Sequence, residues 1–184
     1  VCPINIALTG NDLQELSRRI ESQNEAVYNF FTDRGFGPEE ITRGAVNIND
    51  ARANIYNPQA QSSANRYLAK SEFTVRTSDI PKLQRALTES LELLSRGIVM
   101  GSKNEWQPIE YIFTGLNDLK PEMIEEATKN AREVAAKFAR DSDAEVGEIR
   151  IARHGLFSIT NRDANTPQIK NVRVVSTIDF QLED

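Results

Sequence analysis

The chain has 184 residues and a formal net charge of −5 at pH 7, because 27 aspartates and glutamates outnumber 22 lysines and arginines. This length suits one domain or two small lobes, and a composition of 39% hydrophobic and 27% charged residues excludes an intrinsically disordered chain. The acidic balance also argues against nucleic acid as the main partner, since phosphate binding requires a dense basic surface.

The chain opens with the pattern of a strand followed by a helix. Apolar residues at alternate positions of residues 2–8 predict the strand. Residues 12–34 place their apolar side chains on one helical face, and Gly35 is expected to end this helix in the left-handed conformation.

A hairpin and a second helix are predicted next. Residues 41–56 read as a long strand, and residues 66–77 as the strand that returns from an exposed polar loop at 57–65. A helix is predicted at 79–96 and ends at Gly97 as the first ends at Gly35. The similarity of the two helix ends has two possible explanations. One is a degenerate repeat of strand, helix and glycine stop, and the other is the general use of glycine to end helices.

The second half begins with a predicted strand at 108–114 and a helix at 121–140. The expected apolar seam of this helix consists of Ile124, Ala127, Ala131, Val134 and Phe138. Four alanines spaced four residues apart should form a smooth ridge for close packing: Ala127, Ala131, Ala135 and Ala139. Two further strands are predicted at 145–159 and 172–182, and the alternation in the last is typical of an antiparallel strand with one buried face.

These elements predict an α+β fold, a two-layer sandwich of long antiparallel strands with three helices. The chain is expected to form one domain over residues 1–184, or two interleaved lobes in which 1–40 join 118–184 and 41–117 stand apart. A doubly wound nucleotide-binding fold is disfavoured, because residues 9–12 contain one glycine where a glycine-rich phosphate loop would be needed.

Metal and cofactor chemistry has little support in the sequence. Asp141, Asp143 and Glu145 have the spacing that opens a calcium loop, but Val146 and Ala152 replace the glycine and glutamate that such a loop needs. A solvated acidic turn is the preferred interpretation. With one cysteine and one histidine in the chain, the usual Cys/His zinc sites and an internal disulfide are excluded, and we expect neither a metal site nor a cofactor.

Nucleophilic catalysis is also disfavoured. His154 and Ser158 lie four residues apart, which in a regular strand separates them by about 13 Å, too far to share a proton. Cys2 is expected to be a small buried hydrophobe. Trp106 and Tyr111 either line a ligand groove or, as is more usual for strand aromatics, belong to a core or interface. We therefore expect a protein that is not an enzyme.

Charge is distributed unevenly along the chain. Residues 150–173 contain five basic residues and one acidic residue, a net charge of +4, which leaves −9 for the remainder. The basic residues form a candidate interface: Arg150, Arg153, Arg162, Lys170 and Arg173. A basic segment facing an acidic surface of another copy would favour a fixed docking register, whereas scattered solvated charge is the alternative.

Several segments of the chain occur in a recognisable order. Residues 66–70 (RYLAK) lead into 73–75 (FTV), a helix ends at Gly97 and Ile98, and the alanine-rich helix is followed by Gly147. Together these segments resemble the SIMPL domain family of bacterial cell-envelope proteins. The resemblance covers nearly the whole chain, and the family's α+β fold agrees with the one expected here. It implies an N-terminal signal or membrane anchor upstream, which would explain a start without methionine inside a strand, and it supplies no catalytic residues.

The resemblance favours a non-enzymatic protein that is periplasmic, or anchored in the inner membrane facing the periplasm, with a role in stress defence as one option. We expect it to act through self-assembly, as a homo-oligomer, or through a protein partner, because some members form large ring-shaped assemblies. A small-molecule binding module of the periplasm is the alternative. A large symmetric interface would favour assembly, whereas a convergent polar pocket would favour the binding module.

Overall fold

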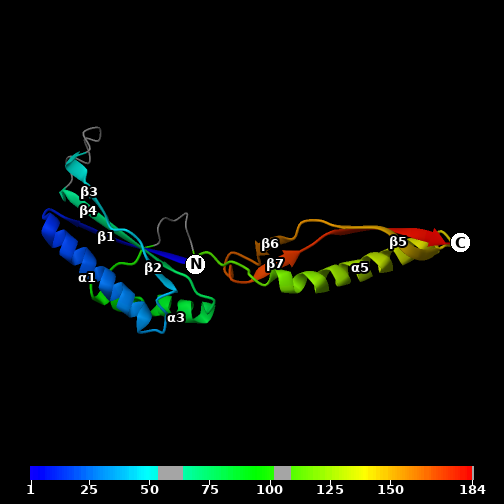
Figure 1. Ribbon diagram of the computed structural model, residues 1–184, viewed down its shortest axis with the longest axis horizontal. Helices are drawn as coiled ribbons and strands as arrows, with labels where there is room; N and C mark the ends of the chain where they lie inside the picture. Colours follow the sequence, from blue (N-terminus) through cyan, green and yellow to red (C-terminus); the bar gives the residue numbers. More distant parts are fainter. Residues whose placement is uncertain (54–63, 102–108, 184) are drawn as a thin grey trace. The chain divides into compact units, whose positions relative to one another are not determined.

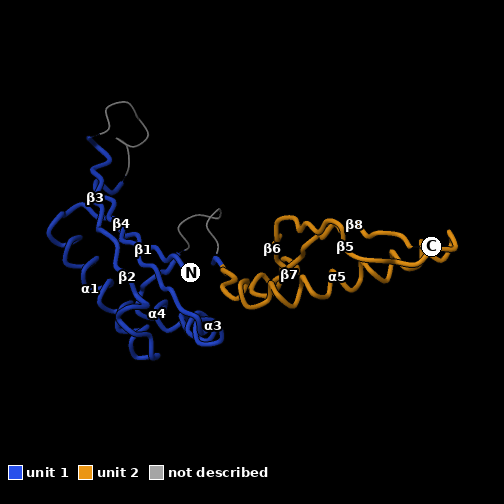
Figure 2. Tube along the Cα trace, turned by 45° about the vertical axis from the view of Figure 1, so that its right-hand side comes forward, with its two compact units in different colours: residues 1–110 blue, residues 111–184 orange. Residues whose placement is uncertain are grey.

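The computed structural model describes residues 1–53, 64–101 and 109–183, and within them it confirms the predicted α+β fold. Helices and antiparallel strands form two compact units, residues 1–110 and residues 111–184 (Figure 2). Each unit is a continuous stretch of chain, which differs from the expected grouping of 1–40 with 118–184.

Unit 1 is built on an antiparallel sheet in which β4 (Tyr67–Val75) is central (Figure 1). β1 (Cys2–Gly10) pairs with one edge of β4 over its whole length. The other edge of β4 pairs with two short strands, β2 (Ile41–Arg43) and β3 (Asn47–Asp50). A single turn of 3-10 helix, η1 (Ala51–Ala53), follows β3.

The first helix of unit 1, α1 (Leu13–Thr32), begins at a side-chain cap and ends at a glycine. The Asp12 carboxylate accepts a hydrogen bond from the Glu15 N–H at 2.8 Å, which satisfies one of the free donors at the helix start. Gly35 then adopts a φ of 82°, and the Phe36 N–H donates to the carbonyl of Phe31. A residue with a side chain would be strained at that φ, so the predicted glycine stop is confirmed.

The predicted helix 79–96 is divided into α3 (Ile80–Glu89) and α4 (Leu91–Ser95). Between them the Ser90 hydroxyl donates to the Leu87 carbonyl at 2.6 Å, a bond that competes with regular helix continuation. The predicted stop after α4 is confirmed, because Gly97 has a φ of 73° and the Ile98 N–H donates to the Leu93 carbonyl.

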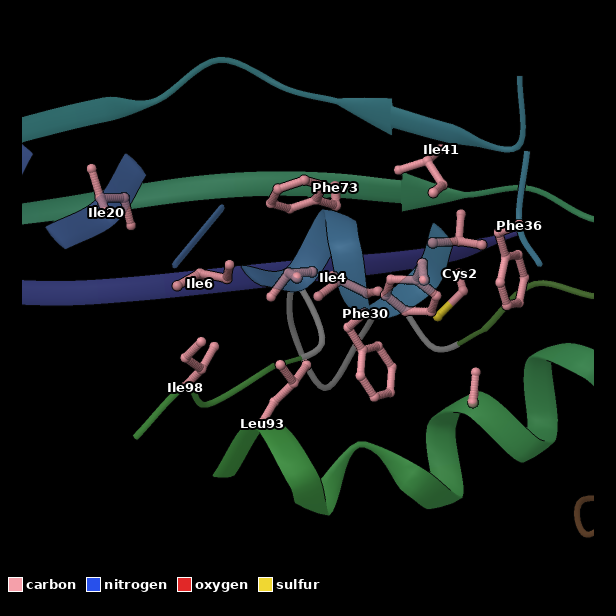
Figure 3. Packing of buried hydrophobic residues seen from close by; sticks show 14 of the residues in the cluster. Cys2, Ile4, Ile6, Ile20, Phe30, Phe36, Ile41, Phe73, Leu93 and Ile98 are labelled. Atoms are coloured by element: carbon pink, nitrogen blue, oxygen red, sulfur yellow. The ribbon is translucent and has the colours of Figure 1, made fainter. Parts of the chain in front are cut away.

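Unit 1 has a continuous hydrophobic core between its sheet and its helices (Figure 3). Cys2, Ile4 and Ile6 of β1 point toward Phe30 of α1 and Leu93 of α4, and all five are nearly inaccessible to solvent. The prediction that Cys2 is a small buried hydrophobe is confirmed, since its exposed fraction is 3%. Alternation along β1 thus places every second side chain in this core.

Unit 2 consists of one long helix lying along antiparallel strands (Figure 1). α5 (Leu116–Asp141) packs against both strands of a two-stranded sheet, β5 (Glu145–His154) and β8 (Ser176–Glu183). A second ribbon of β6 (Ser158–Asn161) and β7 (Lys170–Arg173) lies between β5 and β8 in the sequence.

Several predicted strands differ from those observed. Residues 109–114 form no strand, and residue 108 lies outside the described residues. The predicted strand 41–56 is interrupted after β2, where the Gly44 N–H donates to the Glu72 carbonyl, and residues 54–56 are not described. The predicted strand 145–159 is interrupted at 155–157. Alternation was present in each segment, but a strand also requires a partner for its backbone groups.

Two features named from the sequence fall where little or nothing is described. Residues 57–63 of the predicted polar loop and Trp106 lie outside the described residues. Tyr111 is half-buried in the irregular segment before α5, so its predicted place on a strand is wrong.

Candidate interaction surface

Unit 2 buries very little of itself. Every buried hydrophobic residue of the described chain belongs to unit 1, apart from Ala139 of α5. A single helix on two strands has too few neighbours to surround its apolar side chains, because a fully buried side chain touches about 6 to 12 other residues. The unit therefore has a helix-to-sheet contact layer but no enclosed core.

Many large apolar side chains of unit 2 consequently remain exposed. On α5, Val134 is 50% and Phe138 is 70% exposed. On the sheet, Ile149 is 40%, Ile151 is 44% and Leu182 is 59% exposed. These side chains are available for contact with another chain, which would remove their apolar surface from water.

The alanine ridge of α5 is the part of the helix that does pack closely. Ala127, Ala131 and Ala135 are half-buried and Ala139 is buried, as expected for a ridge facing the sheet. The predicted seam is wrong for Val134 and Phe138, since both lie on exposed parts of the helix. Helical spacing placed them near the seam, but the two-stranded sheet is too narrow to cover them.

Arg132 joins α5 to both strands of the sheet. Its guanidinium donates to the carbonyl of Gly147 on β5 at 3.2 Å and lies 4.9 Å from the ring centroid of Phe180 on β8. The face of the sheet that carries Phe180 is therefore the one covered by α5.

The five basic residues proposed as an interface all lie in unit 2, on two different ribbons. Arg150 and Arg153 are exposed on β5, and Arg173 is exposed on β7. Lys170 of β7 is half-buried and donates to Asn161 at 2.6 Å. The structure thus divides the basic segment into a β5 pair and a group around the β6–β7 ribbon.

Local partners reduce the charge of that second group. Arg162 forms an ion pair with Asp163 at 3.0 Å. Hydrogen bonds from Thr166 and Arg162 lower the pKa of the Asp163 carboxyl, so the carboxylate that offsets Arg162 is kept ionised. By contrast, Arg150, Arg153 and Arg173 take part in no ion pair within the described chain.

The whole arrangement matches a known family. The model of the family described as SIMPL, protein of unknown function (DUF541), matches residues 3–181. The chain belongs to the SIMPL family. No curated protein matches the chain with significant similarity. In this SIMPL protein, residues 67–70 form the first part of β4, Gly97 follows the end of α4, and the alanine-rich segment is α5.

Groups considered for catalysis or metal binding are dispersed in this SIMPL protein. Asp141, Asp143 and Glu145 are exposed around the turn after α5, and the described residues contain no group of three or more His, Cys, Asp and Glu side chains arranged to hold a metal. His154 ends β5, whereas Ser158 begins β6 after the interruption. The His154 Nδ1 lies 3.0 Å from the carbonyl oxygen of Gly155, with no described hydrogen bond to Ser158.

Unit 1 carries a shallow hollow on its surface. Its volume is about 320 Å³. It is lined by Arg19, Ser22, Gln23, Ala26, Arg96 and Ile98. Both arginines already face carboxylates, Arg19 at 4.0 Å from Glu15 and Arg96 at 2.9 Å from Glu92, which weakens any attraction for an anion.

Among the helices that the structure describes, none combines the length and the apolar character needed to span a bilayer.

Proposed function

We propose that this SIMPL protein is a non-enzymatic component of the bacterial cell envelope that acts through self-assembly. The observation that carries the proposal is the exposure of unit 2, in which Ala139 is the single buried hydrophobic residue among those described. Removing apolar surface from water is favourable by roughly 25 cal/mol per Å², before the entropic costs of association are subtracted. Unit 1 also exposes some large apolar side chains, such as Leu91 and Val99, but most of its apolar residues lie in an enclosed core, so unit 2 gains more from association.

Sedimentation velocity over a range of protein concentrations tests this proposal. We expect species heavier than the 20.7 kDa chain, with the proportion of assembled protein rising with concentration. A single species of monomer mass at every concentration would contradict self-assembly. The same chain at low concentration serves as the monomer reference, so no other protein is needed for comparison.

The proposal that the protein is not an enzyme is supported by the state of its few reactive side chains. Burial raises the pKa of the Cys2 thiol, which disfavours the nucleophilic thiolate. His154, the one histidine of the chain, lies exposed at the end of β5 without a described partner that would make it a base for Ser158.

A location facing the periplasm, either free or anchored to the inner membrane, is part of the same proposal and rests on the family. Cell fractionation of the full natural gene product, followed against one cytoplasmic and one periplasmic marker protein, tests it. Recovery of the protein with the cytoplasmic marker would contradict the proposed location but would leave the proposed self-assembly unaffected.

Small-molecule binding is the second candidate, and one feature of the hollow on unit 1 favours it. The side-chain oxygen of Gln23 is buried there and has no hydrogen-bond partner among the described residues. An unpaired buried acceptor is costly, and a ligand with a donor group would satisfy it. A ligand found by mass spectrometry in the native protein and lost in a Gln23→Leu variant would shift the weight to this function.

A further inference from the structure

The β5 strand has an edge that no described strand covers. β5 and β8 form a two-stranded sheet, so β5 pairs on one side and leaves its other edge open within the described part of the chain. An open edge presents backbone N–H and C=O groups in the spacing that another strand would match. A surface for strand addition therefore lies directly beside the exposed apolar residues of unit 2.

The charges along β5 change sign at its middle. Glu145 and Glu148 lie in the first half and Arg150 and Arg153 in the second, with Ile149 between them. All four charged side chains are exposed. None of them forms an ion pair with another described residue.

This order of charges is complementary to itself in one arrangement. If two β5 strands run antiparallel about a two-fold axis through Ile149, residues equally far from Ile149 stand opposite each other. Glu148 then faces Arg150 of the second copy, and Glu145 faces Arg153 of the second copy. The symmetry repeats each pair, and directly opposed charges of opposite sign stabilise an antiparallel pair.

The apolar positions of β5 have the same symmetry. Val146, Ile149 and Ala152 stand opposite Leu182, Phe180 and Ile178 of β8. Cross-strand partners share one face of a sheet, so these three residues lie on the face covered by α5. About the same axis, Val146 meets Ala152 of the second copy, and the two Ile149 side chains meet each other.

Pairing at this edge would also relieve unfavourable features of the single chain. Ile149 is 40% exposed although it lies on the helix-covered face, and a neighbouring strand would cover it. Glu145 stands directly opposite Glu183 of β8, a like-charge pair that is destabilising. Arg153 of a second copy beside Glu145 would offset that repulsion.

The dimensions of helices and strands fit the arrangement. Two strands span about 9 to 10 Å across a sheet, and packed helices lie about 8 to 10 Å apart. A continuous sheet in the order β8, β5, β5, β8 would therefore carry the two α5 helices side by side on one face. The helices neither collide nor leave an open gap at that spacing.

The irregularities of β5 are compatible with this pairing. Bulges and charges on an edge strand commonly prevent association, and β5 shifts register between Val146 and Ile149 and again between Ile149 and Ile151. Because the shifts flank Ile149, the two-fold axis places each shift opposite the shift of the other strand. Parallel strands in register oppose like charges, and a displaced antiparallel register keeps at most one of the two kinds of Glu–Arg pair. The charges therefore favour the register about Ile149, which keeps both.

We propose that β5 pairs antiparallel with β5 of a second copy of this chain, about a two-fold axis at Ile149. This pairing rests on the proposed self-assembly. It is the contact, with its surface and strand register, through which the assembly begins.

Charge variants of β5 test the register. The double variant Arg150→Glu and Arg153→Glu leaves only acidic charges on the strand. The double variant Glu145→Lys and Glu148→Lys leaves only basic charges. We expect each variant alone to associate at least about tenfold more weakly than the natural chain, because every opposed pair becomes like-charged. Mixing the two variants in equal amounts should restore association as a mixed dimer, identified by native mass spectrometry.

A matched control separates pairing from net charge. Arg162→Glu with Arg173→Glu changes the charge as much as the acidic β5 variant but lies outside β5, so its association should remain within about twofold of the natural chain. Assembly of the natural chain with unaffected β5 variants would overturn the β5 pairing and leave self-assembly intact. A natural chain that stays monomeric would overturn both.

A cysteine at the axis tests the geometry directly. Residues that face their own copy across an antiparallel pair have Cα atoms about 4.5 to 5.5 Å apart, within the range of a disulfide. Ile149→Cys should therefore give a covalent dimer under mild oxidation, and Ile159→Cys, on β6 with a similar exposed fraction of 39%, should not. Equal cross-linking of both variants would contradict an axis at Ile149.

Discussion

At the scale of single residues, the ion pair between Glu40 and Lys82 stabilises unit 1. The Lys82 Nζ lies 2.8 Å from the Glu40 carboxylate and also donates to the Gly35 carbonyl at 3.1 Å, so it joins the end of α1 to α3. Both side chains are less than one fifth exposed. Burial opposes ionisation of Glu40, but hydrogen bonds from Lys82, Thr77 and the Gly37 N–H outweigh it and lower its pKa to about 2.

This pKa predicts how stability depends on pH. Because the carboxyl of Glu40 has a lower pKa in the folded chain than its ordinary value of 4.5, its contribution is complete above about pH 5 and is lost as the pH falls toward 2. Glu40→Gln should lower the free energy of unfolding by about 1 to 2 kcal/mol at pH 7, with a smaller difference from the natural chain at pH 3. Urea unfolding at both pH values measures it.

The neighbouring Glu39 provides the control for this experiment. Glu39 is exposed, so Glu39→Gln should change the free energy of unfolding by less than about 0.5 kcal/mol. A Glu40→Gln effect of the same size at pH 7 and pH 3 would show that shape, and not ionisation, accounts for the loss.

At the scale of elements, the alanine ridge decides how closely α5 approaches its sheet. Ala131 is half-buried in the middle of this ridge. Ala131→Leu should destabilise the protein by about 1 to 3 kcal/mol, because a larger side chain forces the helix away from β5 and β8. Thermal unfolding followed by circular dichroism measures the change.

An exposed position of the same helix supplies the comparison. Asn130 is exposed, and leucine has the higher helix propensity, so Asn130→Leu should leave the melting temperature unchanged or raise it. If Ala131→Leu behaves in the same way, the ridge does not face the sheet.

At the scale of the whole molecule, the uneven charge predicts a salt-dependent assembly. Residues 150–173 carry +4 and the remainder −9. Because Arg162 is paired with Asp163, this +4 comes from the other four basic residues, which are Arg150, Arg153, Lys170 and Arg173. Association should weaken about three- to tenfold between 50 and 500 mM salt, because several exposed pairs contribute together and each is screened. Sedimentation in both buffers gives the two association constants.

A double charge reversal tests the origin of that salt effect. Arg153→Glu with Arg173→Glu should weaken association at low salt and reduce the difference between the two buffers. An assembly indifferent both to salt and to this reversal would show that apolar surfaces of α5 or the strands hold it without help from charge.

Features that depend on residues close together in the chain could be predicted from the sequence. The glycine stops at Gly35 and Gly97 follow from a conformation that glycine adopts without strain, and the burial of Cys2 follows from alternation along β1. The α+β class and the family also follow from patterns within the chain, since amphipathic helices and alternating strands must pack in layers.

Which side chains are covered and which backbone groups are paired depends on the three-dimensional packing of distant segments. Val134 and Phe138 fit a buried helical face by spacing, yet the narrow sheet of unit 2 leaves them exposed, and residues 109–114 alternate without pairing as a strand. The symmetric charges of β5 include Glu145 and Glu148, which lie outside the basic segment 150–173. Their symmetry became relevant because the structure shows that one edge of β5 is unpaired among the described strands. Burial and strand pairing depend on partners that are distant in the sequence. Local periodicity does not show whether those partners are present.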